Sequence, residues 1–392
     1  MKKKLCIVIQ RYGTEIVGGA ETYCRIYAER LAQFYDVEVV TTCSLDYIIW
    51  DNHFPEGVTE INGVRVRRFL VDKSRDSELF SELCRRLYGN DSHTIEQAFE
   101  WVNAQGPISK GIISYLKNSA NDFDMFIFMT YLYHHTLKGL PVVKEKAILI
   151  PFAHDEPPAY LKCYDELFGM PRGIVFNTDE ERKFIQLRFK NKDIASVTTG
   201  IGIDIPPTKS FFGKDRRFKL HFPYILYMGR IEKSKGCNEL FEWFLSYKEK
   251  YKSNLRLVLM GKALIDIPEN KSIVSLGFVS DAEKYAVLRK SKLLVLPSHF
   301  ESLSIVVLEA FALEKPVLVS GHSEVLKGHC EKSDAGLYFY GEEDFCECLE
   351  LLYKNPPLRK AMGSLGKKYV DKYYQWDIIM KKLVGFIDGI IN

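Results

Sequence analysis

The chain contains 392 residues, a length that predicts two or three domains at roughly 100–200 residues per domain. Hydrophobic residues make up 46% of it, with 25 Phe and 22 Tyr, so the chain can build buried cores and is not a low-complexity polypeptide. Lys and Arg total 54 against 51 Asp and Glu, and the net charge of +3 excludes the strongly basic surface of most nucleic-acid-binding proteins. We therefore expect no nucleic-acid partner.

The cysteine pattern and the first residues of the chain favour a reducing, cytoplasmic location. Nine Cys are scattered without a C-x-x-C pair, which is typical of reduced, mostly buried thiols. Lys2, Lys3 and Lys4 resemble the start of a secretory signal, but the apolar run after them ends at Gln10. No stretch approaches the roughly 18 apolar residues of a spanning helix. We expect a cytoplasmic protein without a signal peptide; peripheral contact of the leading lysines with anionic lipid at the inner membrane face is an alternative to a solvated start.

The first half of the chain alternates short apolar runs with amphipathic stretches. The apolar runs are continuous, as in parallel strands that are buried on both faces. Asn62-Gly63 between two β-type runs predicts a type I′ hairpin and an antiparallel pair. The predicted strands occupy 5–9, 37–42, 125–129, 147–152 and 173–176, and the predicted helices occupy 20–34 and 179–188.

The pattern breaks near Ile205-Pro206-Pro207 and restarts at Tyr224, which indicates a linker between domains. The tail from 357 to 391 is amphipathic, and a break near 374–376 predicts a last helix that crosses back to the first domain. We expect an α/β fold of two doubly wound domains, with residues 1–207 in the first, 208–374 in the second and 375–392 in the terminal helix. The second domain has predicted strands at 224–228, 255–260, 273–276, 293–297 and 316–320 and predicted helices at 237–250, 281–290 and 303–313.

Two glutamates lie in the most informative segment, where a predicted strand ends before Glu301 and a helix follows. The helix is apolar around Glu309, so an ionised carboxylate there needs a partner, and an internal salt bridge is one alternative. Glu301 could be an ordinary surface residue. Backbone amides at a helix start can hold an anion, which favours a phosphate-bearing ligand. These amides belong to Ser302, Leu303 and Ser304.

Two cations follow the first strand of the second domain. Arg230 leaves the carboxyl end of that strand and Lys235 precedes a helix, so both can reach the crevice in which α/β sheets bind ligands. A diphosphate would suit them, whereas solvated cations in a polar loop are the alternative. The neighbouring Gly229 and Gly236 permit close backbone approach.

Gly18-Gly19 opens the first long helix, a turn that is compatible with phosphate but is also common in plain loops. The dinucleotide fingerprint, the phosphate-binding loop of nucleotide triphosphatases, the zinc-protease motif and the serine-hydrolase elbow do not occur. Asp122-Phe123-Asp124 matches a metal-binding D-x-D pattern but precedes its strand, at the edge away from the expected site. We expect no metal and no nicotinamide cofactor.

His154, Asp155 and Glu156 follow a buried strand of the first domain, where α/β folds carry reactive groups. A histidine that only bonds the loop backbone is the alternative. After the preceding strand come residues that could line an acceptor site or be purely structural, namely Tyr131, Tyr133, His134 and His135.

Together these residues closely resemble the family-4 glycosyltransferases, which adopt the GT-B fold. The resemblance covers nearly the whole chain and is strongest in the second domain, where Glu301 and Glu309 are followed by Ala310 and preceded by Arg230 and Lys235. It implies two Rossmann-like domains facing a central cleft. A nucleotide-sugar donor would bind mainly to the second domain, and the acceptor mainly to the first.

The resemblance also implies residue roles. Arg230 and Lys235 would hold the donor diphosphate, Glu309 would accept hydrogen bonds from the ribose, and Phe278-Val279 would lie beside the nucleobase. The catalytic candidates are His154, Glu301 and Asp155. The donor-binding candidates are Gly18, Gly19, Arg230, Lys235, Gly261, Phe278, Val279, Glu301, Ser302, Leu303, Ser304 and Glu309.

We expect a retaining glycosyltransferase that needs no cofactor and moves a sugar from a UDP or GDP carrier to a glycan or lipid-linked acceptor of a bacterial envelope polysaccharide. The sequence departs from the family at Ser304, where many members have Gly, and at the acid-rich segment His154-Asp155-Glu156. A sugar-nucleotide epimerase or phosphorylase of the same fold, and a non-catalytic nucleotide-sugar-binding protein, are the alternatives.

Overall fold

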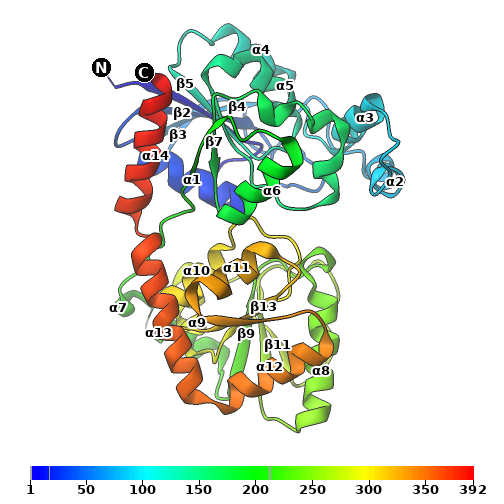
Figure 1. The fold of residues 1–392 in the computed structure, drawn as a ribbon, viewed down its shortest axis with the longest axis vertical. Helices are drawn as coiled ribbons and strands as arrows, with labels where there is room; N and C mark the ends of the chain where they lie inside the picture. The colour runs from blue at the N-terminus through cyan, green and yellow to red at the C-terminus, as the bar shows by residue number, and fades with distance from the viewer. Residues whose placement is uncertain (1, 17, 212) are drawn as a thin grey trace. The chain divides into compact units, whose positions relative to one another are not determined.

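The computed structural model describes residues 2–16, 18–211 and 213–392 and divides the chain into two compact units (Figure 1). The first unit contains the residues up to Gly200 together with Met380–Asn392, and the second contains Ile201–Ile379. The division falls a few residues before the predicted boundary at 207, and the end of the chain groups with the first unit.

The first unit contains an eight-stranded sheet of order β3-β4-β2-β1-β5-β6-β7-β8. All neighbouring strands are parallel except β3 and β4, which form the predicted hairpin around Asn62-Gly63, both with positive φ (51° and 79°). The strands are β1 (Lys4–Val8), β2 (Asp36–Thr42), β3 (Gly57–Ile61), β4 (Val64–Phe69), β5 (Met125–Met129), β6 (Ala147–Ile150), β7 (Gly173–Phe176) and β8 (Ala195–Thr198).

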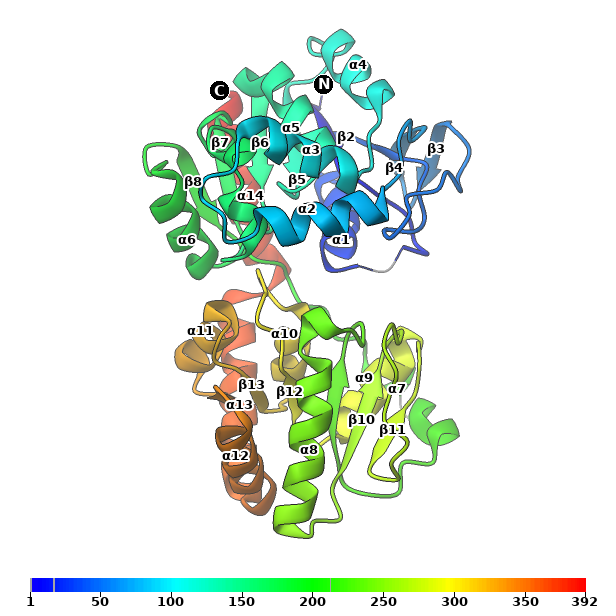
Figure 2. The same cartoon turned by 90° about the vertical axis from the view of Figure 1, so that its right-hand side faces the viewer.

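Helices surround this sheet in both views (Figures 1 and 2). The helices predicted after β1 and β7 are present. The sequence did not predict the helices between β4 and β6 or the last strand of this sheet. The helices are α1 (Gly19–Leu31), α2 (Ser77–Leu87), α3 (Ile95–Gln105), α4 (Lys110–Asn118), α5 (His134–Gly139) and α6 (Asp179–Phe189), with short 3-10 turns η1 (Leu140–Lys146), η2 (Pro157–Tyr160), η3 (Lys162–Tyr164) and η4 (Leu167–Gly169).

The second unit contains a six-stranded, all-parallel sheet of order β11-β10-β9-β12-β13-β14. Its strands are β9 (Tyr224–Met228), β10 (Arg256–Met260), β11 (Ile273–Ser275), β12 (Leu294–Leu296), β13 (Val317–Ser320) and β14 (Gly336–Phe339). Its helices are α7 (Thr208–Phe211), α8 (Cys237–Tyr251), α9 (Asp281–Lys290), α10 (Ile305–Ala312), α11 (Glu324–Ser333), α12 (Glu342–Lys354) and α13 (Pro356–Tyr373), with η5 (Lys214–Phe218) and η6 (Lys233–Lys235).

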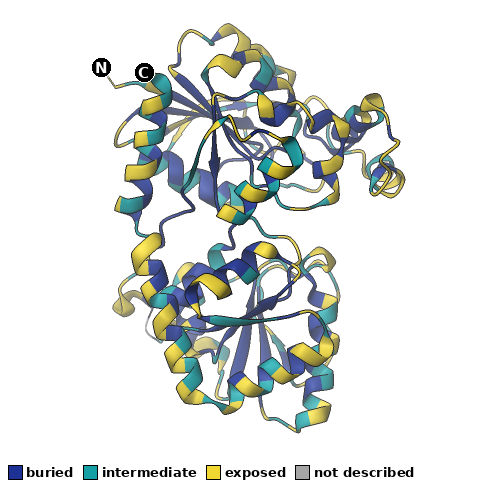
Figure 3. Cartoon of the chain, in the orientation of Figure 1, coloured by how far each residue is buried: buried dark blue, intermediate teal, exposed yellow. Residues whose placement is uncertain are grey.

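The central strands of both sheets are buried on both faces, as their continuous apolar sequences predict (Figure 3). Each unit therefore has its own core of the doubly wound kind. Among the described residues, no helix combines the length and the apolarity that crossing a bilayer requires.

The last helix, α14 (Trp376–Ile391), packs its second half on the first unit. Ile387 is fully buried there, and the Tyr35 hydroxyl donates a 3.0 Å hydrogen bond to Asp388. Gly173 leaves room for the helix, because a Cβ at that position would overlap Ile390. The tail is thus part of the core of the first unit.

Replacing Ile387 with Ala should lower the free energy of unfolding of the first unit by about 2–5 kcal/mol, because the substitution leaves a cavity in a packed core. Lys382→Ala, on the exposed side of the same helix, should change it by less than about 0.5 kcal/mol. Chemical denaturation of the two variants measures the difference. Equal effects would contradict packing of α14 on the first unit.

Candidate functional site

The loops after β9 and β12 bring a cation and an acid together in the second unit. Lys235 Nζ lies 2.8 Å from Glu301 Oε1 and donates to the Phe300 carbonyl at 3.4 Å. Arg230 lies in the loop before η6 and pairs with Glu232 at 3.1 Å. The carboxyl ends of neighbouring parallel strands are where open α/β sheets bind ligands. The predicted residues therefore meet at the expected edge.

Two glycines in these loops permit close backbone contacts that a side chain would block. Gly236 has φ 73°, and a Cβ there would lie 2.7 Å from the Pro297 carbonyl oxygen after β12. Gly261 follows β10 with φ 147°, and a Cβ there would overlap the Gly229 carbonyl. The structure gives Gly261 this packing role within the loop layer, which positions the backbone that carries Arg230.

Ser304 caps α10 in a conformation that favours glycine. Its φ is 64° and its side chain is 93% buried, with no hydrogen-bond partner for Oγ among the described residues. A left-handed conformation costs a non-glycine residue roughly 1–2 kcal/mol, and a buried hydroxyl without a partner adds to that cost. The first turn of a helix also leaves backbone N–H groups free. The start of α10 thus offers donors and a strained, unsatisfied hydroxyl.

Glu309 is buried on α10 and already has partners within the unit. Lys284 Nζ donates to its Oε1 at 2.7 Å and the Tyr285 hydroxyl donates to the same oxygen at 2.9 Å. The internal ion pair considered as the alternative for Glu309 is therefore present. Oε2 has no recorded partner among the described residues, so it can still accept from a ligand. Burial lowers the pKa of Lys284, but the Glu309 carboxylate more than offsets this and the net shift is upward.

Further predicted donor-side residues lie in the same unit. Phe278 follows β11 and is 68% exposed, an unusual position for a phenyl ring, and Val279 beside it is partly exposed. Ser302 is partly exposed, whereas Leu303 is buried and its carbonyl lies 2.7 Å from His329 Nε2. The sequence did not predict Lys284, Tyr285 or His329, because no motif links them to Glu309 on α10 or to the Leu303 carbonyl that they contact.

In the first unit, the segment after β6 forms a second group of polar contacts. His154 Nε2 lies 3.2 Å from Glu156 Oε2, and the Tyr131 hydroxyl donates to Glu156 Oε1 at 2.8 Å. Asp155 is exposed and accepts a 2.6 Å hydrogen bond from Tyr160. Tyr131 is fully buried, so in this conformation it holds Glu156 and presents no surface to an acceptor.

A buried carboxyl group, that of Glu181, is hydrogen-bonded to the backbone next to His154. Glu181, in the first turn of α6, accepts from the Ala153 N–H at 2.7 Å and from the Asn177 N–H at 2.6 Å. Burial raises the pKa of Glu181 to about 8, although these hydrogen bonds act in the opposite direction. Thr130 and Phe152, at the ends of β5 and β6, have φ of 68° and 53°. Non-glycine residues with such left-handed backbone conformations are often found at active sites and ligand-binding sites.

The remaining predicted residues of the first unit have different surroundings. Tyr133 and His134 are partly exposed and begin α5, whereas His135 is buried. Gly18 precedes α1 in extended backbone, and Gly19 is exposed with open space around a Cβ. Among the described residues of this unit, no atom lies close enough to require glycine at position 19.

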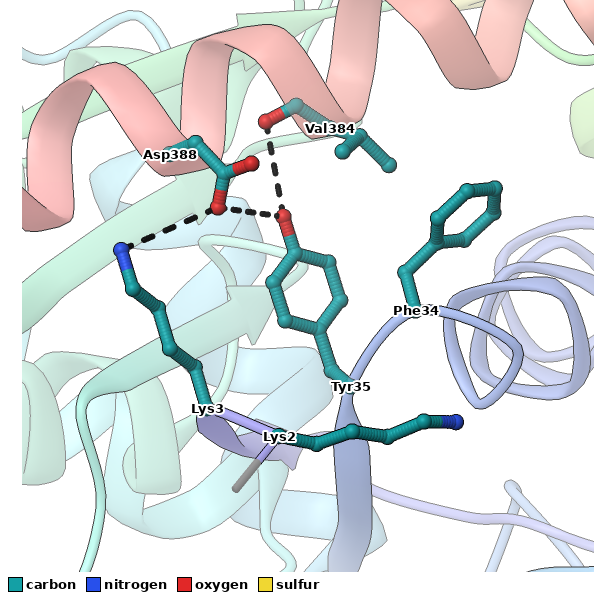
Figure 4. A pocket seen from close by; sticks show the side chains of 6 residues that line it. All are labelled: Lys2, Lys3, Phe34, Tyr35, Val384 and Asp388. Carbon is teal, nitrogen blue, oxygen red and sulfur yellow. Dashed lines mark hydrogen bonds and ion pairs between the residues drawn. The ribbon is translucent and has the colours of Figure 1, made fainter.

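A pocket of about 500 Å³ lies at the opposite edge of the first sheet (Figure 4). It is lined by Lys2, Lys3, Phe34, Tyr35, Val384 and Asp388. Lys3 lies 3.9 Å from Asp388, and Lys2 donates to the Ala32 and Gln33 carbonyls, so both lysines already have partners within the unit. Because it adjoins the amino end of β1, it is separate from the loops at which ligands of α/β sheets bind.

The second unit matches the family model of glycosyl transferases group 1 over residues 210–369. The chain is 28% identical over 167 residues to glycosyltransferase 1 domain-containing protein 1 of Xenopus tropicalis, covering 40% of this chain and 47% of that protein. It is 26% identical over 168 residues to the capsular polysaccharide biosynthesis glycosyltransferase CapM of Staphylococcus aureus, covering 40% and 43%. The matched part thus spans less than half the length of these relatives.

Solved glycosyltransferase structures resemble the chain over nearly its whole length. Sucrose-phosphate synthase of Thermosynechococcus elongatus has a TM-score of 0.71 at 15% identity and covers 99% of both chains. WaaG, a glycosyltransferase involved in lipopolysaccharide biosynthesis, has a TM-score of 0.66 at 14% identity and covers 96% of this chain and 98% of its own. The fold is GT-B, with two Rossmann-like domains, as the sequence predicts.

Ser304→Gly should stabilise the second unit by about 1 kcal/mol more than Ser304→Ala does, because only Gly relieves the positive φ while both remove the unsatisfied hydroxyl. Denaturation of the two variants gives the comparison. Equal stability of the two would mean that no backbone strain is stored at this residue.

Stability should fall as the pH rises from about 5 to about 8, because the folded state keeps on Glu181 a proton that the unfolded chain loses near pH 4.3. The contribution is complete below the unfolded pKa and is lost as the pH rises through the folded pKa. Glu181→Gln should flatten the dependence of Tm on pH across this window, whereas Glu166→Gln, at an exposed position, should not. An unchanged slope in Glu181→Gln would contradict the raised pKa.

Proposed function

Because residues 210–369 match the family model of glycosyl transferases group 1 and the chain has the GT-B fold, we propose that it is a glycosyltransferase of this group, which transfers a sugar from a nucleotide-diphosphate sugar to a glycan or lipid-linked acceptor. We assign it to family 4, with retention of anomeric configuration and without a metal.

The observation that carries the proposal is the Lys235–Glu301 ion pair beside the start of α10. An arriving diphosphate can take over the Lys235 ammonium group, and Arg230 in the adjoining loop adds a second positive charge. The Ser304 hydroxyl supplies a donor that has no partner among the described residues. Cations and oriented N–H groups stabilise the negative charge that develops on a departing diphosphate, which is the main requirement of this reaction.

The rest of the nucleotide fits the chemistry of the same unit. Glu309 is held by Lys284 and Tyr285 through Oε1, so Oε2 can accept hydrogen bonds from ribose hydroxyls. The exposed ring of Phe278 can pack against the nucleobase. This arrangement suits UDP and GDP alike.

The first unit would supply the acceptor side. His154, supported by Glu156, can contact the transferred sugar or the acceptor hydroxyl, with Asp155 as a second polar group. The similarity of the second unit to CapM supports a role in bacterial envelope polysaccharide synthesis. We propose that the enzyme acts in the cytoplasm, with peripheral contact at the membrane that carries a lipid-linked acceptor.

Lys235→Ala and Glu309→Ala should each abolish sugar transfer and donor hydrolysis. The first removes the positive charge that would bind the diphosphate, and the second removes the carboxylate that would accept hydrogen bonds from the ribose hydroxyls. A panel of nucleotide diphosphates and nucleotide sugars should raise the Tm of the wild-type protein with preference for one base, and this shift should disappear in Lys235→Ala.

Lys233→Ala is the matched control, because Lys233 is an exposed cation in the same short 3-10 turn. It should retain both the thermal shift and the activity. Near-normal transfer by Lys235→Ala and Glu309→Ala would refute the donor site. Saturable binding without product would favour a non-catalytic binding protein.

A further inference from the structure

Arg75 belongs to a group of basic and aromatic residues at the carboxyl edge of the first sheet. It lies in the loop after β4, Trp50 lies in the loop after β2, and Tyr133 and His134 follow β5. These strands lie close together in the sheet, in the order β4-β2-β1-β5. The Trp50 and Tyr133 rings are 5.5 Å apart in an edge-to-face arrangement, and the Arg75 guanidinium lies 5.8 Å from the Trp50 ring. We refer to these four residues as the Arg75 cluster.

The guanidinium of Arg75 is held in place through only one of its nitrogens. Its Nε donates to the Gln105 carbonyl at 3.0 Å, and the same carbonyl accepts from the Trp50 indole at 3.0 Å. The ring of Phe80, on α2, lies 4.9 Å from the Arg75 guanidinium. In the described part of the chain, no carboxylate pairs with Arg75 and no acceptor is recorded for Nη1 or Nη2. The terminal nitrogens therefore form an oriented fork for which the described residues supply no acceptor.

Two other arginines at this edge provide a comparison. Arg11 uses its guanidinium on Glu21 at 2.5 Å and on the Leu45 carbonyl at 2.7 Å. Arg68 donates from both terminal nitrogens, to Thr59 at 2.8 Å and to the Tyr12 carbonyl at 2.9 Å. The terminal nitrogens of Arg11 and Arg68 thus donate to protein acceptors, whereas those of Arg75 can donate to a ligand.

The surroundings of Arg75 make an unpaired cation costly. Burial lowers the pKa of Arg75 because it disfavours the charged form, although the nearby Tyr133, Tyr47, Cys84 and Asp46 act in the opposite direction. Trp50 adopts φ 65°, a genuine outlier for a bulky residue, and Gly106 packs so tightly that a Cβ would lie 3.2 Å from Trp50 and from the Arg75 backbone. Strain and desolvation at one place are typical of a site prepared for a ligand.

We propose that the Arg75 cluster binds an oxyanion carried by the acceptor, a phosphate or a carboxylate on a sugar, so that the acceptor is acidic. The planar fork of arginine matches two oxygens of such a group, and partial burial strengthens the pairing. The inference rests on the proposed transfer function, since the first unit is there the acceptor side.

The other residues of the cluster suit a sugar that carries this anion. Tyr133 is partly exposed and can contact a sugar ring. His134 has a buried Nδ1 without a hydrogen-bond partner in the described residues, and burial lowers its pKa to about 4. A neutral imidazole can donate one hydrogen bond and accept another, which fits a sugar hydroxyl next to the anionic group.

The test uses the full chain and inorganic phosphate or acetate as the probe, each compared with chloride at the same ionic strength. Because the donor site also holds cations, the measurements are made in the Lys235→Ala background. Phosphate or acetate should raise Tm by about 2–4 °C when it is well above its Kd. Arg75→Gln should abolish the shift, and Arg75→Lys, which keeps the charge but not the fork, should retain less than half of it.

Arg85→Gln is the matched control, because Arg85 is an exposed arginine on α2 without a recorded acid partner. It should keep the full shift. A response to phosphate alone would identify a phosphorylated acceptor, and a response to acetate a carboxylated one. No response to either anion, or a response that survives Arg75→Gln, would overturn the proposal.

A separate readout distinguishes this outcome from failure of the proposed function. With Lys235 intact, the nucleotide-dependent rise in Tm should be the same in Arg75→Gln as in the wild-type protein. It also reports that the variant is folded. If nucleotides did not raise the Tm of the wild-type protein, the donor site would be contradicted, whether or not phosphate or acetate binds.

Discussion

The ion pair between Lys235 and Glu301 joins two loops whose residues are 66 positions apart in the chain. The pair forms only because β9 and β12 are neighbouring parallel strands that end at the same edge, and because Gly236 lets its loop approach Pro297. In the described state each charge satisfies the other, so the site is stable when empty. Under the function proposed above, a diphosphate would replace Glu301 as the partner of Lys235, and the released carboxylate would be available to the transferred sugar.

The sequence was sufficient to predict the two doubly wound domains because a continuous apolar run has few alternatives to a buried parallel strand. It was less informative between β4 and β5, where α2, α3 and α4 are amphipathic helices without long apolar runs. One signal was readable there: Thr94 and Gln97 form a capping box at the start of α3. The terminal helix was identified from its amphipathic pattern, whereas its packing partners Tyr35 and Gly173 depend on tertiary structure.

Site residues were predictable where a motif lies in one loop and unpredictable where the partner comes from another element. The position of Arg230, Lys235 and Glu301 at one edge of the sheet could be predicted because they follow predicted strands. Lys284 and Tyr285 lie on a helix whose sequence contains no sign of Glu309, and only packing brings them together. Tyr131 followed a predicted strand equally well, yet it is buried, because position at a strand end does not determine which way a side chain faces.

The contribution of α14 to the first unit makes that unit discontinuous in the chain. Its sheet and most of its helices are translated first, but the surface beside Gly173 stays uncovered until the whole second unit and then Ile387 have left the ribosome. The second unit, by contrast, is an uninterrupted segment and can fold as soon as it emerges. The half of the protein that begins synthesis first is therefore the last to complete its core, and early termination after the second unit would leave an exposed apolar strip on the first.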